Sequence, residues 1–319
     1  MKLVVTGGAG YIGSIVAALL VEDGHEVIVL DNLSQGQREA IPEGARFVEG
    51  CSADFGQIFK SESNIEAVLH FAAFMQAGES VEQPEKYWQN NTVGSLKLLE
   101  GMRQLGIKKL IFSSTAAVYG NPVTIPITES AATKPTNPYG MTKLAVDMAV
   151  ASECPAHGLA ATSLRYFNVA GAYKKFGERH KPETHIIPLA LIAAAEEREF
   201  TIFGGDYPTD DGTCVRDYIH VEDLARAHLL ALNKLQAGKH NIYNLGNGSG
   251  FSNKQVLQTV EDVTGRKLKF KIGPRRPGDP AMLVASSGLA GQELGWKPQK
   301  PQLQTMVKDA WQFYQATPR

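Results

Sequence analysis

The first half of the chain alternates short apolar runs with stretches of helical pattern. The strand-like runs cover residues 3–6, 26–30, 46–48, 67–71, 108–112 and 161–165, and helix-like segments separate most of them. Parallel strands need a long crossover between them, and right-handed crossovers place helices on both faces of one sheet. The alternation therefore predicts an α/β fold built on a doubly wound parallel sheet.

After about residue 171 this alternation gives way to short elements that are broken by proline and glycine. Gly204-Gly205 and Gly246-Asn247-Gly248 are turn signals of this kind. Residues 215–232 nevertheless look like a strand and a helix that return to the main sheet. We therefore expect two interleaved parts, a larger domain formed by residues 1–171 and 215–245, and a smaller domain formed by residues 172–214 and 246–319.

Residues 6–13, TGGAGYIG, join the first strand-like run to the first helix-like segment and contain Gly7, Gly10 and Gly13. Glycines at such a junction allow a tight turn, close approach of backbone amides to a pyrophosphate, and close packing of helix on strand. Asp31 ends the next strand, where its carboxylate can accept from both hydroxyls of an adenosine ribose and would repel a 2′-phosphate. This context predicts a Rossmann-type site in the larger domain that binds NAD in preference to NADP.

Three hydroxyl residues at 113–115 follow the fifth strand-like run. About two dozen residues later, Pro138 is suited to start a helix that carries Tyr139 and Lys143 on one face, because they are four positions apart. The hydroxyls can bind a substrate oxygen beside the phenol. Lys143 and a positively charged nicotinamide would lower the phenol pKa, ordinarily about 10, and make the tyrosine a usable base.

Composition and charge exclude several classes of partner. Charged residues make up 20% of the chain, its net charge is −1 and its pI is about 6.7, which gives no overall attraction to nucleic acid or to an anionic membrane. The longest apolar stretch, residues 186–195, is too short to span a bilayer. Because residues 2–5 enter a strand directly and three scattered cysteines include no Cys-x-x-Cys pair, we expect a cytoplasmic protein without a signal peptide.

Several longer motifs extend this pattern along the chain. They are VTGGAGYIGS, DNLS, GESV, SSTAAVYG, NPYG-x-TK, LRYFNVAGA, GGDYPTDDGTCVRDYIHVEDLA, YNLGNG and RRPGDP. Over essentially its whole length the chain resembles the extended short-chain dehydrogenase/reductase family, and within it the UDP-glucose 4-epimerases. The resemblance implies reversible, NAD-dependent inversion at C4 of UDP-glucose and UDP-galactose through a 4-keto sugar, with a nucleotide-sugar site in the smaller domain.

The resemblance also assigns roles to individual residues. The catalytic set falls on Thr115, Tyr139 and Lys143, and Ser114 competes with Thr115 for the role of the hydroxyl. The implied NAD contacts are Gly7, Gly10, Tyr11, Ile12, Gly13, Asp31, Asn32, Ser34, Gly36, Cys51, Ser52, Phe71, Ala72, Ala73, Met75, Asn90, Tyr139, Lys143 and Phe167. The implied UDP-sugar contacts are Thr115, Tyr139, Asn168, His185, Ile186, Thr201, Ile202, Phe203, Arg216, Arg276, Asp279 and Leu283.

Three of these assignments retain an alternative. Asn90 or its neighbour Asn91 either satisfies backbone groups or contacts the nicotinamide ribose. Phe71 and the alanines that follow it either pack in the core or contact the cofactor. The arginines at 216 and 276 either clamp the diphosphate or belong to a surface network in which Asp217 and Glu222 balance their charge.

Two sequence features bear on the reaction type and on the sugars that the site accepts. The related 4,6-dehydratases carry an Asp-Glu pair after the strand threonine, whereas this chain has Ala116 and Ala117, so an eliminating step has no obvious acid or base. The resemblance also implies that Leu283 bounds the sugar pocket, where a tyrosine would crowd a 2-acetamido group, so we expect some turnover of UDP-N-acetylhexosamines. Two alternatives to the function of a UDP-glucose 4-epimerase stay open. One is another nucleotide-sugar epimerase or dehydrogenase, and the other is a redox-inactive NAD-binding sensor, which would need none of the catalytic set.

Two further predictions concern assembly and metal. The helix after Lys143 is apolar nearly all round, which predicts that it and the helix expected at 85–105 bury a second face in a homodimer. His180 and His185 lie five residues apart, but no further ligand pattern accompanies them, so we expect loop histidines and no metal.

Overall fold

The computed structural model describes residues 1–276 and 279–317, and Pro277 and Gly278 of the RRPGDP motif lie outside this range. A seven-stranded sheet forms its centre, in the order β3-β2-β1-β4-β5-β6-β10, with every neighbouring pair parallel. The strands are β1 (Lys2–Thr6), β2 (Glu26–Asp31), β3 (Arg46–Glu49), β4 (Ala67–His70), β5 (Lys109–Thr115), β6 (Ala160–Tyr166) and β10 (His240–Leu245). The prediction of a doubly wound parallel sheet is confirmed.

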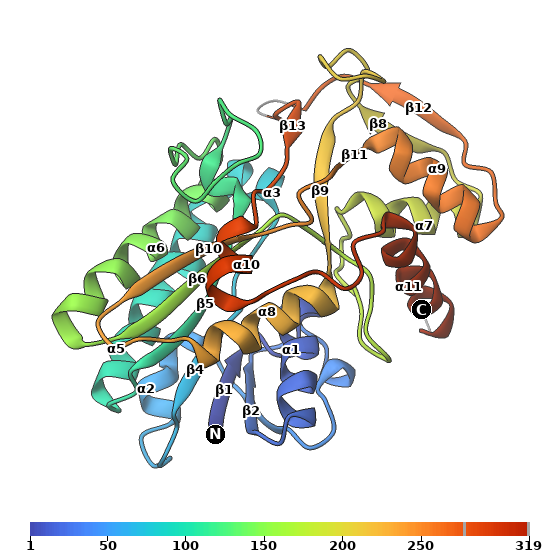
Figure 1. Ribbon diagram of the computed structural model, residues 1–319. Coiled ribbons are helices and arrows are strands. Elements are labelled where there is room, and N and C mark those ends of the chain that lie inside the picture. Colours follow the sequence, from blue (N-terminus) through green and yellow to red (C-terminus); the bar gives the residue numbers. More distant parts are fainter. Residues whose placement is uncertain (277–278, 318–319) are drawn as a thin grey trace.

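Helices cover both faces of this sheet (Figure 1). Side chains alternate along each strand, so Leu3 and Val5 of β1 pack with α1 (Tyr11–Glu22) and α8 (Val221–Asn233) in one core cluster. Val4 points to the other face and packs in the cluster that contains α5 (Gly94–Gln104) and α6 (Pro138–His157). Both sides of the sheet are therefore sealed from water, and polar chemistry is left to the strand ends.

The remaining elements of this part are short. They are η1 (Arg38–Ala40), η2 (Ser52–Asp54), α2 (Phe55–Ile58), α3 (Ala77–Glu82), α4 (Pro84–Tyr87), the π-helical turn η3 (Trp88–Val93), η4 (Ala116–Tyr119) and α10 (Gly288–Leu294). The single helix expected at 85–105 is thus three consecutive segments, α4, η3 and α5. The chain passes from β3 at one edge to β4 beside β1, and this reversal of strand order leaves a crevice at the carboxyl ends of β1 and β4.

The smaller part lies beside this end of the sheet (Figure 1). Its central strand, β9 (Val215–His220), pairs with β7 (Asn168–Ala170), β11 (Gly250–Ser252) and β13 (Met282–Leu283), and β8 (Phe200–Phe203) pairs with β12 (Phe270–Gly273). Helices α7 (Ile186–Glu196), α9 (Asn253–Thr264) and α11 (Leu303–Ala316) share one apolar core with these strands.

The prediction that residues 215–232 return to the main sheet as strand and helix is wrong for the strand. β9 belongs to the second sheet, whereas α8 packs on α1 and β10 extends the main sheet. The strand hydrogen-bonds β7, which follows β6 directly, so the chain has already left the main sheet before position 215. The proposed division into two domains at residues 171, 215 and 245 stays a prediction.

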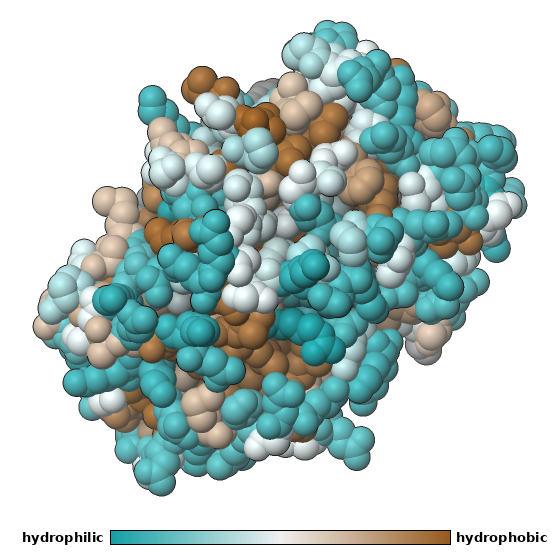
Figure 2. Space-filling view, viewed as in Figure 1, coloured by the Kyte–Doolittle hydropathy of each residue, from teal (hydrophilic) through white to brown (hydrophobic). Residues whose placement is uncertain are grey.

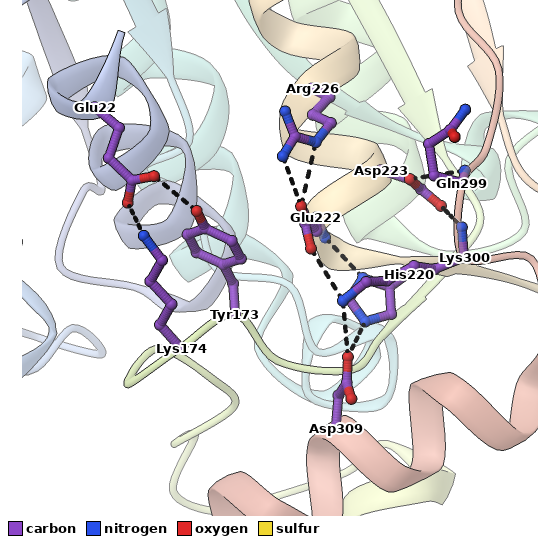
Figure 3. Close-up of polar contacts among 10 residues, drawn as sticks. All are labelled: Glu22, Tyr173, Lys174, His220, Glu222, Asp223, Arg226, Gln299, Lys300 and Asp309. Atoms are coloured by element: carbon purple, nitrogen blue, oxygen red, sulfur yellow. Dashed lines mark hydrogen bonds and ion pairs between the residues drawn. The ribbon is translucent and has the colours of Figure 1, made fainter. Parts of the chain in front are cut away.

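A polar network ties α8 to the C-terminal segment (Figure 3). His220 is buried at the start of α8, where its Nδ1 accepts from the Glu222 amide at 3.0 Å and its Nε2 lies 3.1 Å from Asp309 of α11. Lys300 Nζ lies 3.0 Å from both Asp309 and Glu222, and the Asp223 carboxylate accepts the backbone amides of residues 299 and 300. Glu222 therefore balances Lys300 and, at 2.7 Å, Arg226, so its proposed pairing with Arg216 or Arg276 is wrong.

The surface is that of an ordinary globular protein. In the face shown in Figure 2, hydrophilic residues predominate and hydrophobic ones gather in separate areas. Among the described residues, no helix is both long enough and apolar enough to cross a bilayer. Cys51, Cys154 and Cys214 are all free thiols.

Candidate active site

One large cleft opens at the carboxyl ends of the central strands, between the main sheet and the smaller part. It is lined by most of the residues predicted from the sequence: Gly7, Gly10, Tyr11, Ile12, Gly13, Asp31, Asn32, Ser34, Gly36, Cys51, Ser52, Phe71, Ala72, Ala73, Met75, Asn90, Thr115, Tyr139, Lys143, Phe167, Asn168, His185, Arg216, Asp279 and Leu283. Residues from both parts of the chain therefore face the same space.

The glycine loop forms the floor of the cleft where β1 passes into α1. Gly7 has φ +71°, and a Cβ atom there would lie 2.5 Å from the amide nitrogen of Ala72 at the end of β4. A Cβ at Gly13 would lie 2.3 Å from the Gly7 carbonyl oxygen, so α1 can pack this close to the loop only without side chains. Gly10 caps α1 with no side chain over its free amides. This cradle fits the pyrophosphate of a dinucleotide at a helix N-terminus.

Asp31 lies at the end of β2 beside this loop. Its Oδ2 accepts from the Ala9 amide at 3.0 Å and its Oδ1 from the Leu33 amide at 2.8 Å, which leaves one lone pair on each oxygen directed elsewhere. Burial raises the pKa of this carboxyl, and the two amides oppose that effect. A Cβ on Gly36 would approach both carboxylate oxygens to 2.9 Å, so the carboxylate faces a space kept open by glycine. These contacts fit the ribose of NAD.

The first turn of α6 positions Tyr139 and Lys143. Asn137 caps the helix by accepting from the Gly140 amide at 2.9 Å, and Pro138 occupies the first helical position, as predicted. One turn later Lys143 Nζ donates to the Ser113 carbonyl of β5 at 2.8 Å and lies 5.0 Å from the centre of the Phe112 ring. The helix therefore brings phenol and ammonium to the end of β5.

Burial is the largest influence on the pKa values of Tyr139 and Lys143. Burial raises the pKa of Tyr139, and its hydrogen bond with Thr115 opposes the rise. Burial lowers the pKa of Lys143 to about 8, although Asp147 acts in the opposite direction. In the protein by itself burial therefore raises the Tyr139 pKa, in the direction opposite to the predicted lowering, and the Lys143 ammonium is held by a backbone carbonyl.

The three hydroxyls of β5 have different neighbours. Ser114 donates to Asp147 Oδ2 at 3.1 Å in a buried network. Arg165 donates to the same oxygen at 3.0 Å and to the Tyr119 hydroxyl at 2.9 Å. Thr115 instead accepts the Ala117 amide at 3.2 Å and interacts with Tyr139, whose pKa it lowers. Of the two competing hydroxyls, Thr115 is the one in contact with the phenol.

The structure gives one of the two asparagines, Asn91, the backbone role that the sequence left open. Asn91 is buried, accepts from the Phe74 amide at 2.8 Å and donates to the Phe74 carbonyl at 2.9 Å, so it satisfies the backbone. Asn90 lines the cleft. Both lie in the π-helical turn η3, a distortion that is frequent at functional sites and that periodicity in the sequence did not reveal.

Only part of the predicted nucleotide-sugar set faces the cleft. Arg216 and Asp279 do, 3.5 Å apart, and Arg276 contacts Asp279 at 3.1 Å with more than half of its own side chain exposed. Ile186, Thr201, Ile202, Phe203 and Arg276 do not line the cleft, and Ile202 is buried in the core of the smaller part.

Asp217 has a structural role. It is fully buried and accepts amides from residues 247, 248 and 285 at 2.8 to 3.0 Å. Burial raises its pKa to about 6, although these amides lower it. The alternative in which it balances the arginines is therefore wrong: it fastens the YNLGNG turn beside β13.

Sequence reasoning missed several cleft residues. Asn137 was overlooked although Asn before Pro is a recognisable helix start. Glu178 also lines the cleft, together with His185 and with His180, which was expected only to be a loop histidine. The irregular segment that carries them between β7 and α7 has no periodicity from which its folding could be predicted.

Comparisons with known proteins agree with this geometry. The family model described as the NAD dependent epimerase/dehydratase family matches residues 3–246. A UDP-glucose 4-epimerase of Corynebacterium glutamicum is 56% identical over 99% of this chain and 96% of its own. A UDP-glucose 4-epimerase of Bifidobacterium longum, solved with NAD+ and UDP, superposes with a TM-score of 0.93 at 35% identity, covering 99% of this chain and 98% of that one. The UDP-Glc/GlcNAc 4-epimerase of Campylobacter jejuni superposes with a TM-score of 0.86 at 39% identity, covering 99% of this chain and 99% of that one.

The glycine cradle, the carboxylate of Asp31 and the Thr115-Tyr139-Lys143 group thus occur in a chain that matches these enzymes from end to end. The prediction of NAD as cofactor is confirmed by the family and by the NAD-bound neighbour. The chain belongs to the NAD dependent epimerase/dehydratase family, the group that includes the UDP-glucose 4-epimerases it resembles along its whole length.

Proposed function

We propose that the protein interconverts UDP-glucose and UDP-galactose by inverting C4 of the sugar through a 4-keto intermediate. The observation that carries this proposal is the contact between Thr115 and Tyr139 at the end of β5, with Lys143 one turn along α6, inside a cleft that also holds the NAD cradle. NAD, when bound, accepts a hydride from C4 and returns it.

Each catalytic side chain has a distinct task. Tyr139 takes the proton of the 4-hydroxyl and later gives it back, and Thr115 hydrogen-bonds the phenol beside the same oxygen. Lys143 supplies a positive charge near the phenol, which favours the phenolate once the cofactor and sugar exclude water. Ala116 and Ala117 follow Thr115 in η4 and offer no acid or base for a dehydration.

Inversion requires that the keto sugar present its other face while the nucleotide stays bound. The polar side chains fit this requirement, since Arg216 and Asp279, which belong to the smaller part, line the same cleft as Tyr139. A planar guanidinium suits the diphosphate, and the carboxylate suits a ribose hydroxyl. Anchoring at the UDP leaves the sugar free to turn.

The test is product analysis with UDP-galactose as the only substrate. Wild-type protein with NAD should form UDP-glucose until an equilibrium mixture is reached. Tyr139→Phe should lower turnover by ~10²- to 10⁴-fold with NAD binding intact, and Tyr173→Phe, which removes only a 2.7 Å surface bond to Glu22, should not. Bound NAD without any turnover would favour the redox-inactive sensor instead.

We also propose that the protein is a cytoplasmic homodimer. Exposed apolar side chains on and near α5 and α6 support this assembly, since Met148 is 64% exposed, Leu96 44% and Met141 41%. Light scattering at micromolar concentration should give twice the mass of the chain, and Met148→Asp should shift it towards the monomer. A wild-type monomer would refute the dimer.

A second activity is epimerisation of UDP-N-acetylhexosamines. Leu283, on β13, lines the cleft, and a relative that acts on both UDP-Glc and UDP-GlcNAc shares the fold at 39% identity. Leucine is smaller than tyrosine, so a 2-acetamido group has room beside it.

A further inference from the structure

Glu178, His180 and His185 form a compact group on the wall of the cleft. They come from the irregular segment between β7 and α7, and His185 is the N-cap residue of α7. One ligand atom from each residue lies within 4.8 Å of the others. Among the described residues this is the one group of three His, Cys, Asp or Glu side chains that converges in this way.

The contacts inside the group differ from ordinary hydrogen bonds. His180 Nδ1 contacts Glu178 Oε1, yet this nitrogen is buried and has no hydrogen-bond partner because the angles are unsuitable. His185 Nδ1 lies 3.8 Å from the other oxygen of Glu178. Two imidazoles and a carboxylate therefore face one small volume, in which Glu178 pairs with His180 and His185 Nδ1 also has Glu183 as a neighbour at 2.8 Å.

We propose that Glu178, His180 and His185 bind one divalent transition-metal ion, with Zn²⁺ as the preferred ion. Two imidazoles and one carboxylate are a ligand set that Zn²⁺ uses, at about 2.0 to 2.2 Å from the metal. Tetrahedral geometry then puts ligand atoms about 3.3 Å apart, and the candidate ligand atoms here lie within 4.8 Å of one another. All three residues line the cleft, so the fourth position faces the cleft and takes a water molecule.

Glu183 is a neighbour of this site and is not one of its ligands. Its Oε1 accepts the amides of Thr184 and His185 at 2.6 and 2.7 Å and lies 2.8 Å from His185 Nδ1. It therefore orients the start of α7. The ion joins residues 178–180 to this helix, and its effect is to fix the segment that closes one wall of the cleft.

The experiment measures metal binding without reference to activity. Tag-free protein saturated with NAD is treated with a chelator, dialysed, and titrated with ZnCl₂ by calorimetry, with metal content measured by mass spectrometry. Wild type should bind one ion per chain. Because even neighbours of metal ligands typically contribute 10- to 100-fold to affinity, Glu178→Gln and His180→Gln should each weaken binding by more than about 100-fold.

Two matched controls define the site. His157→Asn removes an exposed histidine whose Nε2 lies 3.9 Å from Glu153, and it should leave the stoichiometry at one. Glu183→Gln should keep a stoichiometry of one ion per chain and weaken binding by no more than about 10- to 100-fold, because Glu183 is a neighbour of His185 and not a ligand. Co²⁺ in place of zinc should give the visible absorption of a tetrahedral ion in wild type and not in Glu178→Gln.

Three results would overturn the proposal. The first is a wild-type protein that binds no stoichiometric Zn²⁺, which requires no variant to fold. The second is an equal loss of binding in His157→Asn, which would indicate nonspecific surface binding. The third is a loss in Glu183→Gln with Glu178→Gln unaffected, which would assign different ligands.

Discussion

Replacing Lys143 by methionine should stabilise the protein while it damages the active site. Lys143 is 3% exposed, and burial lowers its pKa from 10.5 to about 8. This difference means that the charged side chain costs the folded state about 3 kcal/mol at neutral pH. Methionine keeps the apolar stem and removes this cost, which stabilises the folded state. It cannot make the hydrogen bond to the Ser113 carbonyl, and this loss cancels about 1 kcal/mol or more of the gain in stability.

The free energy of unfolding of the wild type depends on pH through Lys143, and the direction of this dependence can be derived from the two pKa values. Between the folded pKa and the unfolded pKa the unfolded chain holds a proton that the folded protein has released, so wild-type stability rises with pH in that window. The destabilisation of the folded state by charged Lys143 has its full size below about pH 8 and disappears above about pH 10.5. The advantage of the Lys143→Met variant should therefore shrink by about 2 kcal/mol between about pH 6.5 and pH 9.5.

Urea denaturation of both proteins at these two pH values, at equal NAD content, measures the difference directly. Every other titrating group occurs in both proteins, so comparison isolates Lys143. Turnover of UDP-galactose should fall in the same variant. If the stability difference between the two proteins does not change with pH, or if the advantage of the variant grows as pH rises, the lysine is not buried as a costly cation and the reasoning fails.

Three further substitutions test other parts of the site. Asp31→Ala should weaken NAD binding and leave NADP binding little changed, and equal losses for both cofactors in a calorimetric titration would contradict the role of the carboxylate. Asp147→Ala should cost about 3 to 5 kcal/mol in urea denaturation, because the buried Arg165 is then unpaired, whereas Glu153→Ala at an exposed pair should cost less than about 1 kcal/mol. Leu283→Tyr should abolish turnover of UDP-N-acetylhexosamines and spare UDP-galactose, and no change in that ratio would place the residue outside the sugar pocket.

The fold of the larger part and the centre of the site follow from short-range sequence features. Strand and helix periodicity, the glycines at 7, 10 and 13, and the helix start at Pro138 act over one or two turns, so their consequences are visible without a structure. Asp31 could be placed because it ends a recognisable strand. A four-residue spacing puts Tyr139 and Lys143 on the same face of any helix.

Tertiary structure decided what depends on distant contacts. β9 follows the pattern of a buried strand, but nothing in that pattern says which sheet it joins, because its partners β7, β11 and β13 are distant in the sequence. Whether Ser114 or Thr115 meets Tyr139 depends on Asp147, 33 residues further along, which binds the serine. Glu178 comes together with His180 and His185 because the chain folds back irregularly against the cleft, and a segment without periodicity leaves no record of that path in its sequence.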